Sequence, residues 1–373
     1  MPFLTDRMQD TARKAQMQRA LADENETDIS GLHQAPSSGL VNSRFSFDLD
    51  AISAELRHNI IGQDAAIEAL LNMLKVVRAD IGDPRKPLAT ILFCGTTGVG
   101  KTETVRSLAR ILYGDADAMC RIDMNTLAQE HYSAAFTGAP PGYVGSKEGT
   151  TILDQEKIEG SRNLPGLVLF DELEKASDEV VLALLNVFDN GLLTVASGER
   201  TYSFRNAIIF MTSNLGANQL LALQDKGRGI LSALRARKMA AQTDAAREIV
   251  LDSLLARFPP EFVNRIDHID TFRWIDHATM PKLVALEVER LNRRLRKHDC
   301  CVELTFEVAE YLIEQGFDQR FGARELRRAL RHHLEFPLAE YLLQPQDDAK
   351  RNASGQRVLQ AELRNKKIVF GQS

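Results

Sequence analysis

Apolar residues follow two patterns along the chain from about Phe45 onward, short continuous runs and repeats at helical spacing. The short runs predict four β-strands, at Ala89–Cys94, Ala118–Asp123, Leu167–Phe170 and Ala207–Thr212. The helical spacing predicts a helix between the first two strands, from Val105, Leu108, Ala109 and Leu112. Gly114 is placed to end that helix, and Ser177 is a good N-cap for a second one. Apolar strands that alternate with helices predict an α/β fold with a parallel sheet covered on both faces.

The pattern changes after about Ile275, where the strand signal fades. Helices are expected at Pro281–His298, Phe306–Gln315 and Ala323–Leu342, before a short strand at Lys367–Phe370. At the other end, Asp6–Leu21 is compatible with a helix, but the rest of the first 44 residues is polar and rich in breakers. We therefore expect an N-terminal arm (1–44), a large α/β domain (45–274) and a small, mostly helical C-terminal domain (275–373).

Composition narrows the class of protein. The apolar fraction of 44% and the charged fraction of 26% are typical of a soluble globular chain and exclude collagen-like or wholly disordered ones. The net charge of −5 disfavours general binding to nucleic acid. Four cysteines are too few for a disulfide framework, and we find neither a signal peptide nor an apolar stretch that could span a membrane. We expect a cytoplasmic protein with no membrane and no nucleic-acid partner.

The strongest local motif follows the first predicted strand. It satisfies the pattern G-x-x-x-x-G-K-[ST] with Gly95, Thr96, Thr97, Gly98, Val99, Gly100, Lys101 and Thr102. Glycines let successive backbone N–H groups turn towards phosphate oxygens, and the following helix adds partial positive charge at its N-terminus. Lys101 would reach the β- and γ-phosphates, and the Thr102 hydroxyl would hold Mg²⁺. The motif therefore predicts an ATP site with Mg²⁺ as the metal.

Two adjacent carboxylates end the third predicted strand, in Leu167-Val-Leu-Phe-Asp171-Glu172. An apolar run that ends in Asp-Glu is common, but beside a phosphate loop it acquires a role. Asp171 suits the Mg²⁺ shell, and Glu172 suits the activation of a water that attacks the γ-phosphate. The pair favours hydrolysis over simple nucleotide storage.

Several further motifs occur in a fixed order around these two. They are Ile60-Ile61-Gly-Gln-Asp64, Arg121-Ile-Asp-Met124, Gly138-Ala-Pro-Pro-Gly-Tyr143-Val144-Gly145, Met211-Thr-Ser-Asn214-Leu-Gly216, Phe258-Pro-Pro-Glu-Phe-Val-Asn-Arg265-Ile-Asp267 and Gly322-Ala-Arg324. Together they resemble the AAA+ ATPases of the Clp chaperone family, in particular the second nucleotide-binding module of the ClpA and ClpB types. The resemblance runs from about Ile60 to Leu343. It implies a P-loop parallel-sheet large domain followed by a small helical lid domain.

The resemblance also implies roles for single residues. Ile60 and Ile61 would pack against adenine, and Asn214 would bind the γ-phosphate or the attacking water. Arg265 would be an arginine finger for a neighbouring subunit, and Arg324 would report the nucleotide from the small domain. In a mobile glycine-rich pore loop, Tyr143 and Val144 would grip a polypeptide, and Thr194–Phe204 would form a second pore loop. Alternatively, Arg265 is a surface arginine paired with Glu261 or Asp267, and Arg324 is an ordinary helix-surface arginine.

Three functions remain to be distinguished. The first is an ATP-dependent unfoldase or remodelling chaperone that works as a homo-oligomeric ring, a hexamer, and acts on a protein substrate or a partner complex. The second is a nucleotide-gated assembly scaffold that threads nothing, and the third, disfavoured by charge, is a DNA-acting AAA+ loader. Between Asn214 and Phe258 there is no Ile-Gly-Phe/Leu tripeptide, which argues against a peptidase partner.

Overall fold

The computed structural model describes residues 42–128, 136, 152–194, 200–225, 235–318, 322–344 and 357–372. The expected helix at Asp6–Leu21 lies outside these ranges. The described residues from Ser43 onward belong to one compact unit. None of the helices in the described ranges has the length and apolar character that a membrane span requires.

A five-stranded sheet organises the large domain. Its strands are β1 (Ala89–Cys94), β2 (Cys120–Asp123), β3 (Gly166–Asp171), β6 (Ala207–Ser213) and β7 (His268–Thr271). They are all parallel and lie in the order β2-β3-β6-β1-β7. Four of them were predicted within two residues at each end. The fifth, β7, was missed because its polar sequence and half-buried side chains give no apolar run.

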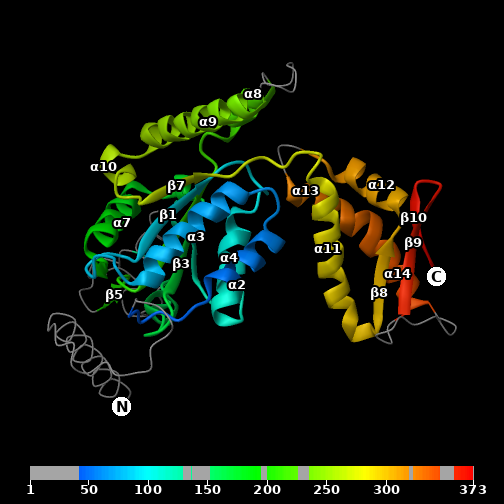
Figure 1. The fold of residues 1–373 in the computed structure, drawn as a ribbon, viewed down its shortest axis with the longest axis horizontal. Helices are drawn as coiled ribbons and strands as arrows, with labels where there is room; N and C mark the ends of the chain where they lie inside the picture. Colours follow the sequence, from blue (N-terminus) through cyan, green and yellow to red (C-terminus); the bar gives the residue numbers. More distant parts are fainter. Residues whose placement is uncertain are drawn as a thin grey trace, which may run out of the picture. The chain divides into compact units, whose positions relative to one another are not determined.

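Helices cover both faces of this sheet (Figure 1). They are α2 (Leu49–Asn59), α3 (Asp64–Ala79), α4 (Lys101–Tyr113), α6 (Gln155–Glu159), α7 (Asp178–Asn190), α8 (Ala217–Asp225), α9 (Arg235–Arg257) and α10 (Pro260–Val263), with 3₁₀ turns η2 (Thr126–Ala128) and η3 (Leu173–Lys175). On one face α2, α3 and α4 pack on residues such as Ile91 and Phe210. On the other face α7, α9 and α10 pack on residues such as Leu92 and Phe170. Alternate side chains of each strand therefore enter two separate cores, as a doubly covered sheet requires.

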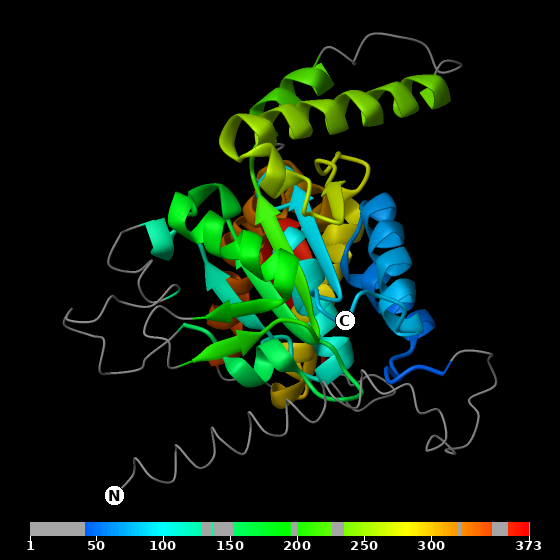
Figure 2. The same cartoon turned by 90° about the vertical axis from the view of Figure 1, so that its left-hand side faces the viewer.

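The predicted helix boundaries in the large domain are confirmed. Gly114 caps α4 with a φ of +75°, and the Ser177 side chain accepts from the N–H of Val180 at the start of α7. The strands β4 (Leu192–Thr194) and β5 (Thr201–Ser203) form a two-stranded ribbon, and the predicted second pore loop, Thr194–Phe204, begins at the last residue of β4 and contains β5. In Figure 2, α8 and α9 lie side by side and run past the end of the sheet.

The small domain is mostly helical, as predicted, but it also contains a sheet. Its elements are α11 (Met280–Leu295), η5 (Arg296–His298), β8 (Cys300–Leu304), α12 (Phe306–Gly316), α13 (Ala323–Leu330), a π-helical turn η6 (Arg331–Glu335), α14 (Phe336–Leu343), β9 (Arg357–Arg364) and β10 (Lys367–Gln372). The strands pair in the order β10-β9-β8. The predicted helix Ala323–Leu342 is therefore interrupted by a π turn, and two strands were missed because they mix polar with apolar residues.

The four cysteines form no disulfide, in agreement with the expectation from their small number. Cys94, Cys120 and Cys300 are buried and Cys301 is partly so, and all four are free. Burial raises the pKa of the Cys94 thiol to about 12 and that of Cys120 to about 11. These thiols stay protonated near neutral pH and belong to the core rather than to a reactive site.

Candidate functional site

The G-x-x-x-x-G-K-[ST] motif forms the loop between β1 and α4. Gly98 and Gly100 have φ values of +77° and +110°, which residues with a Cβ rarely adopt. Gly100 is the N-cap of α4, so the loop leads directly into the N-terminus of a 13-residue helix. Free N–H groups and the positive end of the helix dipole make this point suited to an anion.

Lys101 is the first residue of α4, and its side chain folds back into the loop. Its Nζ donates to the carbonyls of Gly95 (2.6 Å) and Thr96 (2.9 Å) and to Oδ1 of Asn214 (2.9 Å). Only 8% of the residue is exposed, and burial lowers the pKa of its ammonium to about 8. Lys101 is therefore protonated at neutral pH, and three acceptors hold it where phosphate oxygens would arrive.

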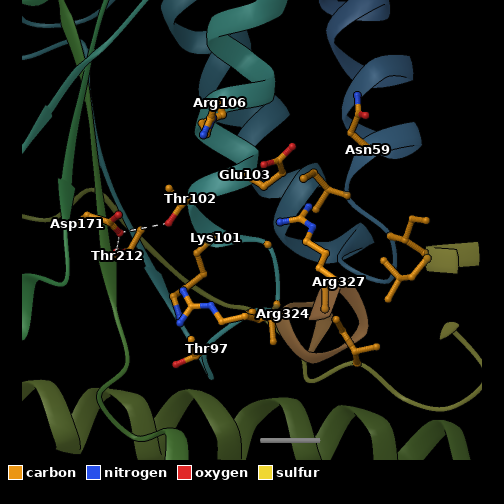
Figure 3. A pocket seen from close by; sticks show the side chains of 18 of the residues that line it. Asn59, Thr97, Lys101, Thr102, Glu103, Arg106, Asp171, Thr212, Arg324 and Arg327 are labelled. Atoms are coloured by element: carbon orange, nitrogen blue, oxygen red, sulfur yellow. Dashed lines mark hydrogen bonds between the residues drawn. The ribbon is translucent and has the colours of Figure 1, made fainter. Parts of the chain in front are cut away.

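Asp171, at the end of β3, is the most tightly held carboxylate of the site. Its Oδ1 accepts from the hydroxyls of Thr102 (3.2 Å) and Thr212 (2.5 Å), as the dashed lines in Figure 3 show. Its Oδ2 accepts from the guanidinium of Arg121 at 2.6 Å. A hydroxyl and a carboxylate side by side match the oxygen donors that Mg²⁺ takes from a protein when phosphates and water supply the rest. Thr102 and Asp171 therefore fit the predicted metal site.

Glu172 follows Asp171 in a left-handed backbone conformation, with φ +58° and ψ +52°. Its N–H donates to the hydroxyl of Thr212 at 3.0 Å, so a single threonine on β6 positions both acids. A non-glycine residue in this region costs about 1 kcal/mol or more and persists only where its surroundings impose it. The turn brings Glu172 to the wall of the cleft that Asp171 and Lys101 also line.

Asn214 lies where the sequence placed it, just beyond the end of β6 and in contact with Lys101. Its other amide atom, Nδ2, donates to Oε1 of Glu174 at 3.1 Å, and the Asn214 N–H donates to the same oxygen at 3.2 Å. An ammonium can only donate and a carboxylate can only accept, so these two partners fix which way the amide points. Both ends of the Asn214 side chain are thus engaged by protein groups.

A cleft of about 460 Å³ contains these residues, and both domains contribute to its wall. Ile60 is buried in the core of the large domain, whereas Ile61 packs against the core of the small domain. Next to them, buried Gln63 donates to the carbonyls of Val99 (3.3 Å) and Arg273 (2.7 Å) and accepts from the Arg273 N–H (2.8 Å). The segment predicted to meet adenine therefore joins the phosphate loop to the chain that connects the domains.

The small domain touches the phosphate loop directly through the start of α13. The N–H of Ala323 donates to the carbonyl of Gly98 at 3.0 Å. At Gly322, with φ +53°, a Cβ would lie only 2.9 Å from that same carbonyl oxygen. From this helix Arg324 extends towards Thr97 and Lys101 in Figure 3. The predicted contribution of Arg324 to the nucleotide cleft is thus compatible with its position.

A chain of ion pairs also crosses the cleft. Arg290 on α11 binds Glu103 on α4 at 2.9 Å and Glu287 at 3.0 Å, and Arg327 on α13 binds Glu287 at 2.9 Å. We call these four residues, Glu103, Glu287, Arg290 and Arg327, the ion clasp. The Arg327 side chain is 48% exposed and that of Arg290 is 22% exposed, so water reaches much of the clasp.

Arg265 does not line this cleft. Its Nε pairs with Asp189 at the end of α7, and its side chain is 43% exposed. The two partners named from the sequence, Glu261 and Asp267, are not those observed, because Asp267 instead accepts from the N–H and hydroxyl of Thr90. Tyr143 and Val144 lie outside the described residues.

Sequence reasoning missed several residues that shape the site. Thr212, Glu174, Gln63, Arg121 and the ion clasp were not assigned roles from spacing. Three of these positions, Gln63, Arg121 and Thr212, fall within quoted motifs, and Glu174 follows the acid pair by two residues. The ion clasp has no comparable local signal, because its members come from three helices far apart in the chain.

Comparisons with known proteins cover both domains. A family model described as AAA domain (Cdc48 subfamily) matches residues 86–269, and one described as the C-terminal, D2-small domain of ClpB protein matches residues 275–353. A protein of Pseudomonas aeruginosa described as ATP-dependent protease ATP-binding subunit-like protein AmiB is 56% identical over 348 residues. That match covers 92% of this chain and 93% of the relative.

Longer relatives match over a part of their length. Chaperone protein ClpB of Aquifex aeolicus is 38% identical over 291 residues, which are 78% of this chain and 28% of that protein. A solved structure, the S. cerevisiae Hsp104:casein complex in an extended conformation, has a TM-score of 0.71 and 28% identity, over 87% of this chain and 52% of that chain. This chain therefore spans less than a third of the ClpB relative and about half of the Hsp104 chain.

Proposed function

This chain belongs to the AAA+ ATPases of the Clp chaperone family, which hydrolyse ATP, and from that premise we propose that it works as a ring, a hexamer, that remodels polypeptide. The single observation that carries the proposal is the cleft itself. It combines a phosphate loop, a buried cationic Lys101, the paired acids Asp171 and Glu172 and an arginine from the small domain.

Within the cleft each residue has a task. Lys101 and the loop N–H groups bind the β- and γ-phosphates, and Thr102 and Asp171 hold Mg²⁺, which neutralises phosphate charge when bound. Glu172 takes the proton of the attacking water, and Asn214 orients that water or the γ-phosphate. Ile60 and Ile61 pack on the base. Arg324 follows the nucleotide from the small domain, so that hydrolysis changes the angle between the domains.

The boundary between these two domains is best placed between residues 274 and 275. This placement is supported by the two family models, which end and begin on either side of it. Residues 1–44 would then be an arm outside the ATPase module.

The ring assignment depends on Arg265. An always-charged planar guanidinium stabilises the charge of a transferring phosphoryl group, and such fingers raise the rate by about 10³–10⁵. Arg265 is partly exposed and does not line the cleft of its own subunit. We therefore assign it to the γ-phosphate of a neighbouring subunit, and we assign Tyr143 and Val144 to the grip on the substrate chain.

The relatives suggest what the ring acts on. Hsp104 in the matched structure is in complex with casein, a polypeptide, which favours a protein client here. The Pseudomonas relative is described as protease-subunit-like, but this chain has no Ile-Gly-Phe/Leu tripeptide between Asn214 and Phe258. We therefore propose a cytoplasmic remodelling motor without a ClpP-type peptidase.

Replacing Glu172 with Gln tests the proposal. The variant should bind ATP but hydrolyse it at least about 100-fold more slowly, since a general base contributes about 10²–10⁴. In cells the ATP-loaded ring should retain its client, which mass spectrometry of the co-purified proteins would identify. Glu172→Gln combined with Tyr143→Ala is the control and should lose the client. A variant that forms rings yet retains no protein would support the scaffold instead.

A further inference from the structure

Glu174 connects the phosphate site to the interior of the large domain. Its Oε1 accepts from the backbone N–H of Asn214 at 3.2 Å and from its side-chain Nδ2 at 3.1 Å. Its Oε2 is buried and, among the residues that the structure describes, has no hydrogen-bond partner. A buried carboxylate with so few donors depends strongly on those it has, because leaving it unsatisfied carries a large desolvation penalty. The position of Glu174 is therefore tied to the state of the Asn214 amide.

Nucleotide would compete for that amide. Asn214 can donate to a γ-phosphate oxygen or to the attacking water only through Nδ2, because Oδ1 is an acceptor that Lys101 already engages. Nδ2 is the atom that Glu174 holds. Nδ2 carries two N–H groups and Glu174 takes one of them, so a γ-phosphate that takes the other would share this nitrogen between two anions and pull the amide towards the nucleotide. ADP, which lacks the γ-phosphate, would leave the amide to Glu174 alone.

Arg257, the last residue of α9, binds the turn that carries Glu174. The Arg257 guanidinium donates from Nε to the carbonyl of Glu174 at 3.2 Å and from Nη2 to that of Ala176 at 2.5 Å. Its Nη1 also pairs with Asp178 at 3.2 Å. The planar guanidinium makes these contacts in a rigid geometry, so a displacement of the η3 turn should displace the Arg257 side chain.

Packed aromatic rings connect Arg257 to the ion pair of Arg265. Its guanidinium lies 5.1 Å from the centre of the Phe258 ring, which is 5.2 Å from that of Phe262. The Phe262 ring is in turn 5.5 Å from that of Phe188, whose neighbour in sequence, Asp189, pairs with Arg265. Phe258 and Phe262 are at most 2% exposed. A close-packed interior transmits displacement, because it cannot be compressed locally.

We propose that Glu174 and Arg257 form a relay that makes the position of the Arg265 segment depend on whether Asn214 is engaged by a γ-phosphate. Both are positioning residues that act through Asn214 and through the segment Phe258–Asp267. The relay rests on the proposed function, in which Arg265 serves a neighbouring subunit. The relay adds that the nucleotide bound to one subunit controls the position of Arg265 in that same subunit, and so its contact with the neighbouring subunit.

Hydrogen exchange of the full chain tests the relay. In the Glu172→Gln background, which keeps ATP bound, amides of Phe258–Asp267 should exchange at least about threefold differently with ATP than with ADP. Adding Glu174→Ala or Arg257→Gln should reduce that difference at least threefold. In Arg257→Gln, whose residue does not line the cleft, affinity for ATP measured with a fluorescent analogue should change less than about twofold. Arg364→Gln is the control, since this arginine forms an exposed ion pair with Glu362 in the small domain.

The effects of the two relay substitutions on hydrogen exchange should not be additive. If both residues lie on one path, the double variant Glu174→Ala/Arg257→Gln should lose no more of the ATP-dependent difference than the stronger single variant. Arg257→Lys retains charge but not the fork, and should behave like Arg257→Gln. Melting curves within a few degrees of the parent would exclude general unfolding as the cause.

Three results would overturn the relay. These are an ATP-dependent difference of full size in both single variants, no such difference in the parent, or the same loss in Arg364→Gln. The exchange signal is read within one subunit, so it does not depend on the ring. If Arg265→Ala leaves ATP turnover unchanged at all protein concentrations, the proposed role of Arg265 in a neighbouring subunit is wrong. The hydrogen-exchange measurements would still test the relay independently.

Discussion

The two walls of the nucleotide cleft are built in different ways. On the large-domain wall, Lys101 and Asp171 are almost fully buried, and each makes three contacts of 2.5–3.2 Å with groups that the sheet holds in place. Among the described residues, the small-domain wall contacts the phosphate loop and α4 through a backbone hydrogen bond at Gly98 and through the ion clasp, which water partly reaches. The first wall is organised before nucleotide arrives, whereas the second is held by contacts that can open and close. Affinity for phosphate should therefore reside mainly in the large domain, and the small domain should mainly affect how readily the cleft opens.

The largest effect should come from removing the Lys101 charge. Lys101→Ala should weaken ATP binding by about 100-fold, because hydrogen bonds to charged groups contribute about 1.5–3 kcal/mol and the loop loses its only cation in direct contact with Gly95 and Thr96. Titration with a fluorescent nucleotide measures the change. Lys282→Ala, at an exposed position on α11, is the control and should bind normally. Similar weakening in both variants would contradict the assignment of affinity to the large-domain wall.

The same wall should respond to pH. Burial lowers the pKa of Lys101 to about 8, so the free protein loses this positive charge as pH rises through 8. Affinity for ATP should fall about tenfold between pH 7 and pH 9, since only the protonated form binds well. The unfolded chain keeps its lysine proton until about pH 10.4, so the free energy of unfolding should gain a contribution from Lys101 between about pH 8 and pH 10. A flat affinity profile would show that phosphate does not meet this ammonium.

The contact between the walls should be broken by Gly322→Ala. The new Cβ would lie 2.9 Å from the carbonyl oxygen of Gly98 at a φ of +53°, so α13 must withdraw from the phosphate loop. We expect ATP affinity to fall about fivefold, with strain of about 1–3 kcal/mol confined to the small domain. Gly371→Ala is the matched control in the same domain, because its Cβ would meet nothing within 4 Å. Equal affinities for the two variants would show that the α13 contact is not needed for binding.

The smallest effect should come from the ion clasp. Arg290→Gln removes two of its three pairs, and partly exposed pairs of this kind contribute about 0.2–1 kcal/mol each. Nucleotide release, followed by stopped flow, should accelerate about two- to fivefold, and the difference from the parent should shrink in high salt. Arg293→Gln, which breaks only an exposed pair with Glu289 outside the clasp, should release nucleotide like the parent. A change that persists in high salt would contradict an electrostatic clasp.

The large-domain wall could be predicted from the sequence, whereas most of the small-domain wall could not. Lys101, Thr102 and Asp171 are fixed by a loop motif and by an apolar strand that ends in acids, both of which are local signals. Arg324 was indicated by its short motif alone. The clasp partners Glu103 and Arg290 are 187 residues apart, and no pattern along the chain relates them. The prediction of the ion-pair partner of Arg265 was wrong for the same reason. Asp189 reaches Arg265 through the packing of α7 against α10, which no local pattern indicates.

The hydrogen bonds of Gln63 have a consequence for how such proteins diverge. All three of its bonds go to main-chain atoms, at Val99 and at Arg273. These three bonds therefore do not depend on the side chains at positions 99 and 273, whereas the amide at position 63 is needed, since Glu would lose the donor and Met would lose both functions. A chimera that takes its small domain from a relative should keep this joint with any residue except proline at position 273, because the N–H of that residue donates to Gln63. The connection between the two domains is thus interchangeable in sequence but fixed in place.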